Sequence, residues 1–181
     1  MLCSYRGAAA AASVVILGLA GCASTTPKPE YSRQIVAEAR VARADHAEVA
    51  IDAPQGVKIL PDEERRLAEK IKVKVDERKV ANLRGGDARS YEIYLHVTRY
   101  DRGNGFARFM MAGLGQIHIE GKIGVYQLPG HTLVGEFDLK KTFAWGGIYG
   151  ATTSVEDIEN TFADGVAAAV TGQQEEPKQK S

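Results

Sequence analysis

Three segments between Tyr91 and Trp145 alternate apolar and polar residues, and this alternation constrains the fold more than any other feature. Successive side chains of a β-strand point to opposite faces, so each segment predicts a strand with one apolar face. The segments read YEIYLHVTRY, GQIHIEGKIGVYQ and HTLVGEFDLKKTFAW, and LPGH, residues 128–131, predicts a hairpin turn between the last two. Their apolar rows are Ile93, Leu95 and Val97; Ile117, Ile119, Ile123 and Val125; and Leu133, Phe137, Leu139 and Phe143.

Two segments whose apolar residues repeat at helical spacing flank these strands. The segment that begins at Pro61 opens with proline and acids, as helix N-termini do, and repeats apolar residues at Leu67, Ile71 and Val75. Because Ile71, Val73 and Val75 also alternate, the end of this segment could be a strand. Residues 153–156, TSVE, fit a capping box. The helix that this box would open carries an apolar stripe of Val155, Ile158, Phe162, Val166 and Val170.

A weaker alternation over residues 44–52 predicts a short first strand, which gives the order β-α-β-β-β-α. Three strands with one apolar face each favour an antiparallel-rich sheet with both helices on that face. We therefore expect an α+β fold, a two-layer sandwich.

The N-terminus predicts export. Arg6 precedes an apolar run that is too short to span a bilayer comfortably, and small residues end it. Residues 19–22, LAGC, resemble the bacterial lipobox, in which a diacylglyceryl group is attached to the cysteine before cleavage. We expect a lipoprotein signal peptide over residues 1–21 and lipidation of Cys22; an ordinary signal peptide or an uncleaved anchor is the alternative. Ala23 follows Cys22 and, by the sorting rule of enteric bacteria, favours the outer membrane.

The rest of the chain divides into three predicted parts. Residues 22–33 are expected to form the lipidated cysteine and a flexible tether, residues 34–170 a single periplasmic domain, and residues 171–181 a disordered polar tail. Cys3 leaves with the signal peptide and Cys22 carries the lipid, so no disulfide and no cysteine-ligated metal is expected. Removing Arg6 from 23 basic residues leaves 22 against 23 acidic ones, and this balance argues against nucleic acid as a partner.

The run RYDRGNGFARFMMAGLGQIHIEGKIGVY, followed by TLVGEF, resembles the bacterial lipoproteins of domain-of-unknown-function family 4410 (DUF4410). The resemblance extends over residues 45–170. Its distinctive part is a glycine segment, in which the matching positions are Gly103 or Gly105, Arg108, Gly113 and Gly115. The resemblance implies the location and the fold, and it implies no reaction.

The glycine segment, residues 103–116 (GNGFARFMMAGLGQ), has two remaining interpretations. A nucleotide-binding loop is disfavoured, because the third glycine of that fingerprint is missing and no GK[ST] follows. In one interpretation the glycines allow tight turns while Phe106, Phe109 and Met110 fill the edge of the core. In the other the segment is an exposed contact surface, and Arg108 reaches a lipid phosphate or an acid on a partner. The candidate contact residues are Phe106, Arg108, Phe109, Met110 and Met111.

Catalysis has little support in the sequence. The four histidines are scattered without metal-ligand spacing, and GxSxG is absent. His96, His118 and Glu120 could converge as a two-histidine, one-carboxylate site, but a solvated sheet face explains them better. Asp101 and Arg102 are expected to form an ion pair in a turn.

A second glycine-aromatic loop, residues 145–150, could cap the edge of the sheet or stack on a sugar or peptide through Trp145 and Tyr149. We thus expect a non-enzymatic, lipid-anchored outer-membrane protein without cofactor or metal that faces the periplasm. Its expected role is that of an accessory or scaffold protein with an envelope partner or as a homo-oligomer. The alternative is a binding module for glycan, peptidoglycan or lipid.

Overall fold

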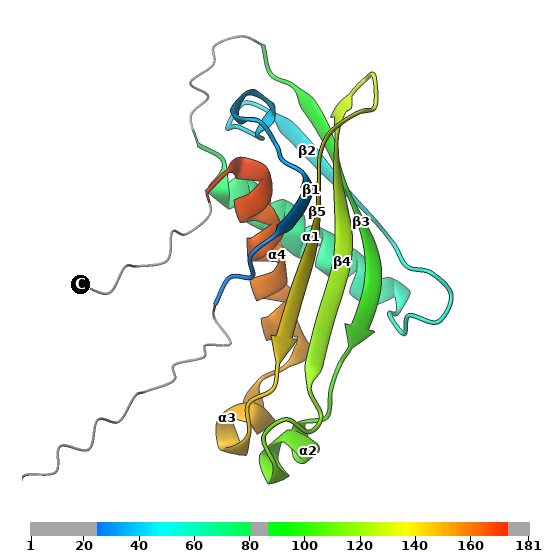
Figure 1. Ribbon diagram of the computed structural model, residues 1–181, viewed down its shortest axis with the longest axis vertical. Coiled ribbons are helices and arrows are strands. Elements are labelled where there is room, and N and C mark those ends of the chain that lie inside the picture. Colours follow the sequence, from blue (N-terminus) through cyan, green and yellow to red (C-terminus); the bar gives the residue numbers. More distant parts are fainter. Residues whose placement is uncertain (1–24, 81–86, 174–181) are drawn as a thin grey trace, which may run out of the picture.

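The computed structural model describes residues 25–80 and 87–173, so the predicted signal peptide, Cys22 and residues 174–181 of the predicted tail lie outside the described residues. A single five-stranded sheet in the order β1-β5-β4-β3-β2 forms one layer (Figure 1). Its strands are β1 (Glu30–Arg33), β2 (His46–Asp52), β3 (Ser90–Asp101), β4 (Ile117–Leu128) and β5 (Thr132–Phe143). The second layer consists of the helices α1 (Pro61–Arg78) and α4 (Val155–Thr171).

The sheet is mostly antiparallel, and its inner face carries the predicted apolar rows. β3, β4 and β5 pair antiparallel, whereas β2 is parallel to β3 and reaches it through α1. The predicted rows of β3 and β4 are fully buried. Leu133 of β5 is an exception and is only half-buried. A bulge between Val125 and Tyr126 places Leu133 opposite Tyr126 and turns Val134 towards the core.

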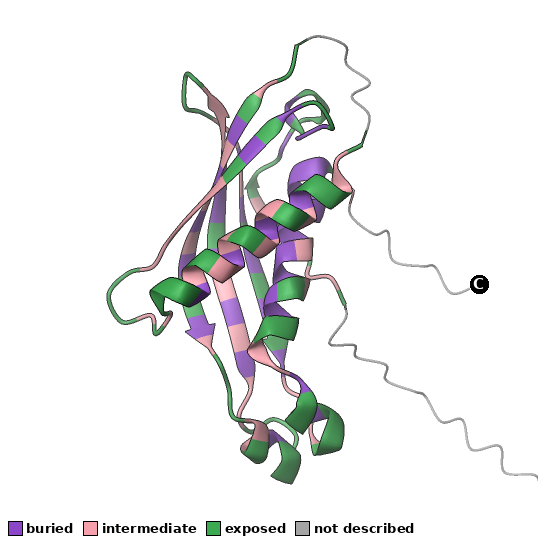
Figure 2. Cartoon of the chain, turned by 180° about the vertical axis from the view of Figure 1, so that it is seen from behind, coloured by how far each residue is buried: buried purple, intermediate pink, exposed green. Residues whose placement is uncertain are grey.

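Both long helices cover the inner face of the sheet (Figures 1 and 2). In α1 the buried residues include Leu67, Ile71 and Val75, and the helix continues to Arg78, which excludes the strand alternative. The predicted stripe of α4 is buried apart from Val155, which packs against the core. The capping box lies one residue later than predicted: Ser154 caps α4 and Asp157 hydrogen-bonds back to it.

A polar cluster joins the two layers at the buried side chain of Glu159. Its carboxylate accepts hydrogen bonds of 2.8 Å from Arg66 and from Lys70, and one of 2.7 Å from the hydroxyl of Tyr100. Burial raises the pKa of Glu159, but these three donors outweigh it, so the pKa lies below its ordinary value. Burial, followed by the hydrogen bond to Glu159, raises the pKa of Tyr100. The cluster therefore fixes α1, α4 and β3 to one another.

The predicted tether over residues 22–33 is wrong for its second half. Residues 30–33 form β1, which pairs antiparallel with β5, and the ring of Tyr31 packs 5.4 Å from that of Phe137. Before β1, Thr26 donates a hydrogen bond of 2.9 Å to Asp164, and the carbonyl of Thr25 accepts one from Lys141. The fold therefore includes the chain from Thr25 onward.

Two short helices that the sequence did not predict close one end of the sheet, at the bottom of Figure 1. They are α2 (Gly105–Met110), between β3 and β4, and α3 (Gly147–Thr152), between β5 and α4. A short 3-10 helix, Ala37–Ala39, follows β1. Among the described residues no helix combines the length and the hydropathy needed to cross a bilayer.

Candidate functional site

Exposed apolar side chains gather on α2, on the loop that follows it and on α3. Figure 2 shows both short helices mostly in the colour of exposed residues. Eight of the twelve exposed large hydrophobic residues in the described part of the chain lie here, and Phe106 and Ile148 are each 75% exposed. We call this surface the apolar tip; its members are Phe106, Phe109, Met110, Met111, Leu114, Trp145, Ile148 and Tyr149. The interpretation in which Phe106, Phe109 and Met110 fill the core is therefore wrong.

Arg108 lies beneath the tip and holds it together. Its side chain is 3% exposed. The guanidinium donates to the carbonyl oxygens of Gly150 at 2.7 Å, Gly115 at 2.6 Å and Thr153 at 2.8 Å. Burial lowers the pKa of Arg108, although an arginine so placed stays charged. This corrects the prediction that Arg108 belongs to the exposed contact surface, because its donors are used inside the protein.

The glycines of the segment make room for this arginine. Gly103 and Gly115 have φ angles of +68° and +62°, which disfavour other residues. A Cβ atom on Gly103 would lie within 2.7 Å of Nη1 of Arg108 and of the carbonyl oxygens of Gly115 and Gln116. Asn104 begins α2 by accepting a hydrogen bond from the backbone of Ala107 at 3.0 Å. The glycines therefore allow a tight connection between β3 and β4, and α2 forms within that connection.

The predicted ligand loop forms part of the same surface. Trp145 and Tyr149 contact each other edge to face, with ring centroids 6.4 Å apart, and Tyr149 also packs on Phe143. Both rings remain exposed, and α3 lies against α2. The structure therefore brings together the two sets of residues that the sequence singled out separately.

The histidines do not form a shared site. His96 pairs with Asp52 at 2.9 Å, His118 with Thr142 at 3.0 Å and His131 with Glu92 at 2.8 Å, while His46 is the exposed first residue of β2. His96 lies opposite Lys122, four residues along β4 from His118, which is about 13 Å of strand. Across residues 25–80 and 87–173, no three His, Cys, Asp or Glu side chains lie close enough to hold a metal ion. The two-histidine, one-carboxylate site is therefore not formed.

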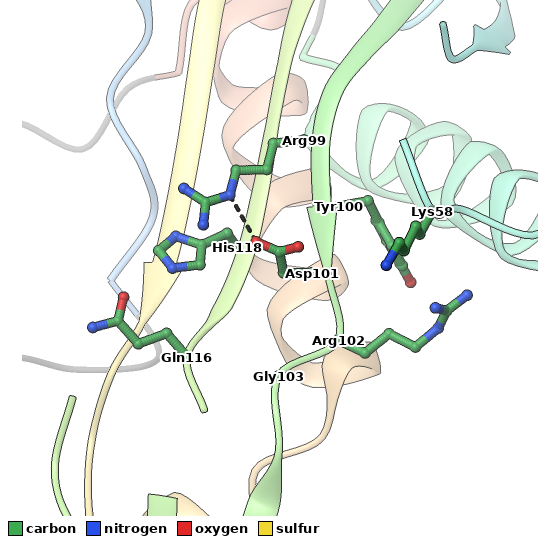
Figure 3. Close-up of a pocket in the computed structure, with 8 residues that line it drawn as sticks. All are labelled: Lys58, Arg99, Tyr100, Asp101, Arg102, Gly103, Gln116 and His118. Carbon is green, nitrogen blue, oxygen red and sulfur yellow. Dashed lines mark hydrogen bonds and ion pairs between the residues drawn. The ribbon is translucent and has the colours of Figure 1, made fainter. Parts of the chain in front are cut away.

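An open pocket of about 600 Å³ lies beside the tip (Figure 3). Its lining residues are Lys58, Arg99, Tyr100, Asp101, Arg102, Gly103, Gln116 and His118. Arg99 pairs with Asp101 at 2.7 Å, and Arg102 pairs with Glu63 of α1. The predicted pair of Asp101 with Arg102 is therefore wrong, and acids already offset two of the three cations. Lys58 and Arg99 were not singled out from the sequence, because no motif surrounds them.

The sequence profile of DUF4410, a domain of unknown function, matches residues 36–147. The chain belongs to the DUF4410 family. The match includes β2 to β5, both α1 and α2, and the start of α3. No curated protein sequence matches the chain.

Solved structures from two bacteria resemble this chain to different degrees. Two crystal structures of the PelC dodecamer from Paraburkholderia phytofirmans are 12% identical to this DUF4410 protein, with a TM-score of 0.55. They cover 82% of this chain and 99% of the PelC chain. A DUF330 protein from Xanthomonas campestris is 13% identical over 82% of this chain and 91% of its own, with a TM-score of 0.39. At these identities the PelC likeness shows a shared fold.

Proposed function

We propose that this DUF4410 protein is a non-enzymatic outer-membrane lipoprotein, anchored through a lipid on Cys22 and facing the periplasm. Its role is that of an accessory or scaffold protein of the cell envelope, and the apolar tip is its contact surface. The lipobox and the preceding apolar run support the anchor. This role needs no cofactor and no metal ion.

The observation that carries the proposal is the tip itself. Monomeric proteins rarely expose a large contiguous apolar patch unless it meets a partner or a membrane. Here a buried arginine and glycines in special conformations hold the patch in place, so it is a built feature of the fold. Phenylalanine, methionine and tryptophan side chains suit contact with an apolar partner.

Self-association is part of the proposal. PelC, which shares the fold, is a dodecamer. Among the described residues β2 is the last strand of the sheet, so its outer edge could pair with a second copy.

The alternative function is a binding module for glycan, peptidoglycan or lipid. It is favoured by the exposed rings of Trp145 and Tyr149 and by the pocket next to the tip. Because Trp145 is the only tryptophan of the chain, its fluorescence would report such a ligand directly. A saturable quench on adding peptidoglycan fragments would favour this alternative over the scaffold.

Photo-crosslinking in cells tests the contact surface. A crosslinker in place of Phe109 should give an adduct with a protein or with lipid, which mass spectrometry distinguishes, whereas one in place of Val73, an exposed residue of α1, should give neither. No adduct from position 109, with the variant folded and exported, would contradict the contact role. Incorporation of labelled palmitate, with Cys22→Ser as the control, tests the anchor separately.

A further inference from the structure

We propose that the apolar tip inserts into the membrane leaflet that holds the lipid of Cys22, so that the domain stands on α2 and α3. This inference rests on the proposed lipid anchor and names the partner of the same surface. The occupant is a lipid bilayer rather than another protein.

The first argument is the charge of the tip. Arg108 is the only charged residue in the two segments that form the tip, residues 103–116 and 144–153. Its side chain is buried. Protein interfaces usually carry a polar rim, whereas a surface that enters hydrocarbon must not carry exposed charge. The tip includes the exposed rings of Trp145 and Tyr149, and these residue types concentrate where membrane meets water.

The second argument is the backbone of the tip. Carbonyl groups without partners are costly in lipid, and loops at that depth need their polar groups satisfied internally. Arg108 donates hydrogen bonds to the carbonyls of Gly115 after α2, Gly150 within α3 and Thr153 at the end of α3. The tip is thus prepared for a surrounding that offers no water.

The third argument is where the anchored end of the chain leaves the fold. β1 runs antiparallel to β5, so the chain, followed backward from Glu30, heads towards the end of the sheet that carries the tip. The carbonyl of Thr25 lies at Lys141, four residues before Trp145, or about 13 Å of strand. Three residues separate Thr25 from Cys22 and can span about 10 Å. A lipid on Cys22 and the tip can therefore reach the same bilayer surface.

The charges next to the tip determine how strongly anionic lipid headgroups attract it. Arg99 and Arg102 are paired with Asp101 and Glu63, so the pocket beside the tip offers little net attraction to anionic headgroups. Insertion should therefore depend on apolar burial and change little with salt.

The test uses Trp145, the only tryptophan, in the full lipidated protein purified from membranes in detergent. Mass spectrometry first determines whether Cys22 carries the lipid. The protein is then added to vesicles of phosphatidylethanolamine and phosphatidylglycerol with brominated acyl chains. We expect a blue shift of the Trp145 emission and strong quenching by the bromines. The variant Phe106→Ser, Phe109→Ser, Ile148→Ser should lose both signals, whereas the control Val36→Ser, Val73→Ser should keep them.

The outcomes separate the two proposals. Lipidated, vesicle-bound protein whose Trp145 emission does not respond to bromine would overturn insertion and leave the anchor standing. Protein without the lipid that still shows the blue shift and quenching would overturn the anchor and leave insertion standing. If the triple variant changes the oligomeric state in detergent while its quenching equals that of wild type, the tip is a contact between protein copies and insertion is wrong.

Discussion

At the scale of single residues, Arg108 has the largest consequences for the tip. Three carbonyl oxygens, one from the β3–β4 connection and two from the β5–α4 connection, lose their donor when this side chain is removed. We expect Arg108→Met to lower the free energy of unfolding by about 3 kcal/mol, since each buried acceptor left unpaired costs about 1–3 kcal/mol and the site can relax. Urea unfolding measures the loss, and Trp145 fluorescence should show the tip loosening first.

Arg108→Lys provides the matched control, because it keeps the charge but has a point-like donor group instead of a planar fork. We expect it to recover only part of the stability. Full recovery would mean that charge, rather than the geometry of the guanidinium, holds the tip.

Glu159 gives a residue-scale prediction for pH. Because its folded pKa is lowered, its stabilisation is present above the unfolded value of 4.5 and is lost as the pH falls through the folded pKa. Glu159→Gln should destabilise the protein by about 3 kcal/mol at neutral pH, since it leaves Arg66 and Lys70 without their buried partner. The difference between variant and wild type in urea unfolding should shrink in acid below pH 4.5.

A surface pair serves as the control for Glu159. Glu48 is exposed and pairs with Lys72, so Glu48→Gln should change the free energy of unfolding by less than about 1 kcal/mol. An equal loss in both variants would indicate that net charge, and not the buried cluster, governs stability in acid.

At the scale of elements, β1 lies where the sequence predicts a flexible tether. Tyr31 packs on Phe137 across the β1–β5 pair. We expect Tyr31→Ala to cost about 1–2 kcal/mol, from lost apolar burial and an aromatic contact. Arg33→Ala, at an exposed position of the same strand, should be nearly neutral. If neither Tyr31→Ala nor Arg33→Ala changes the thermal unfolding of the protein, residues 30–33 behave as a flexible tether after all.

The elements also show what the sequence can and cannot predict. The alternation of Ile93, Leu95 and Val97 places a strand and its buried face, and the spacing of Leu67 and Ile71 places a helix, because these signals are local. β1 escapes prediction because Tyr31 becomes partly buried only through contact with the distant partner strand β5. α2 and α3 are six residues long and begin with glycine, so their helical form depends on contacts from distant parts of the chain.

The same limit applies to the candidate site. The glycine segment and the Trp145 loop stand out by composition, but nothing local shows that they meet. Arginine is rarely buried, so the sequence favours an exposed Arg108. Its burial follows from carbonyls 7, 42 and 45 residues away in the chain.

At the scale of the whole molecule, membrane contact and self-assembly should use different surfaces. If the tip faces lipid, copies associate through the sides of the domain. We expect the lipidated protein in detergent to sediment as a discrete oligomer, and the Phe106→Ser, Phe109→Ser, Ile148→Ser variant to keep the same number of copies. A fall of that variant to monomer in analytical ultracentrifugation would contradict this separation.

The direction of α4 has a practical consequence. The helix starts directly after α3 and runs for 17 residues, so Gly172 ends it about 25 Å from the tip. Energy transfer from a donor fluorophore at Gln173 to an acceptor dye in the bilayer would therefore measure the distance between the end of α4 and the lipid. Upright protein should transfer energy weakly and reclining protein strongly, so a single labelled site reports the tilt of the domain.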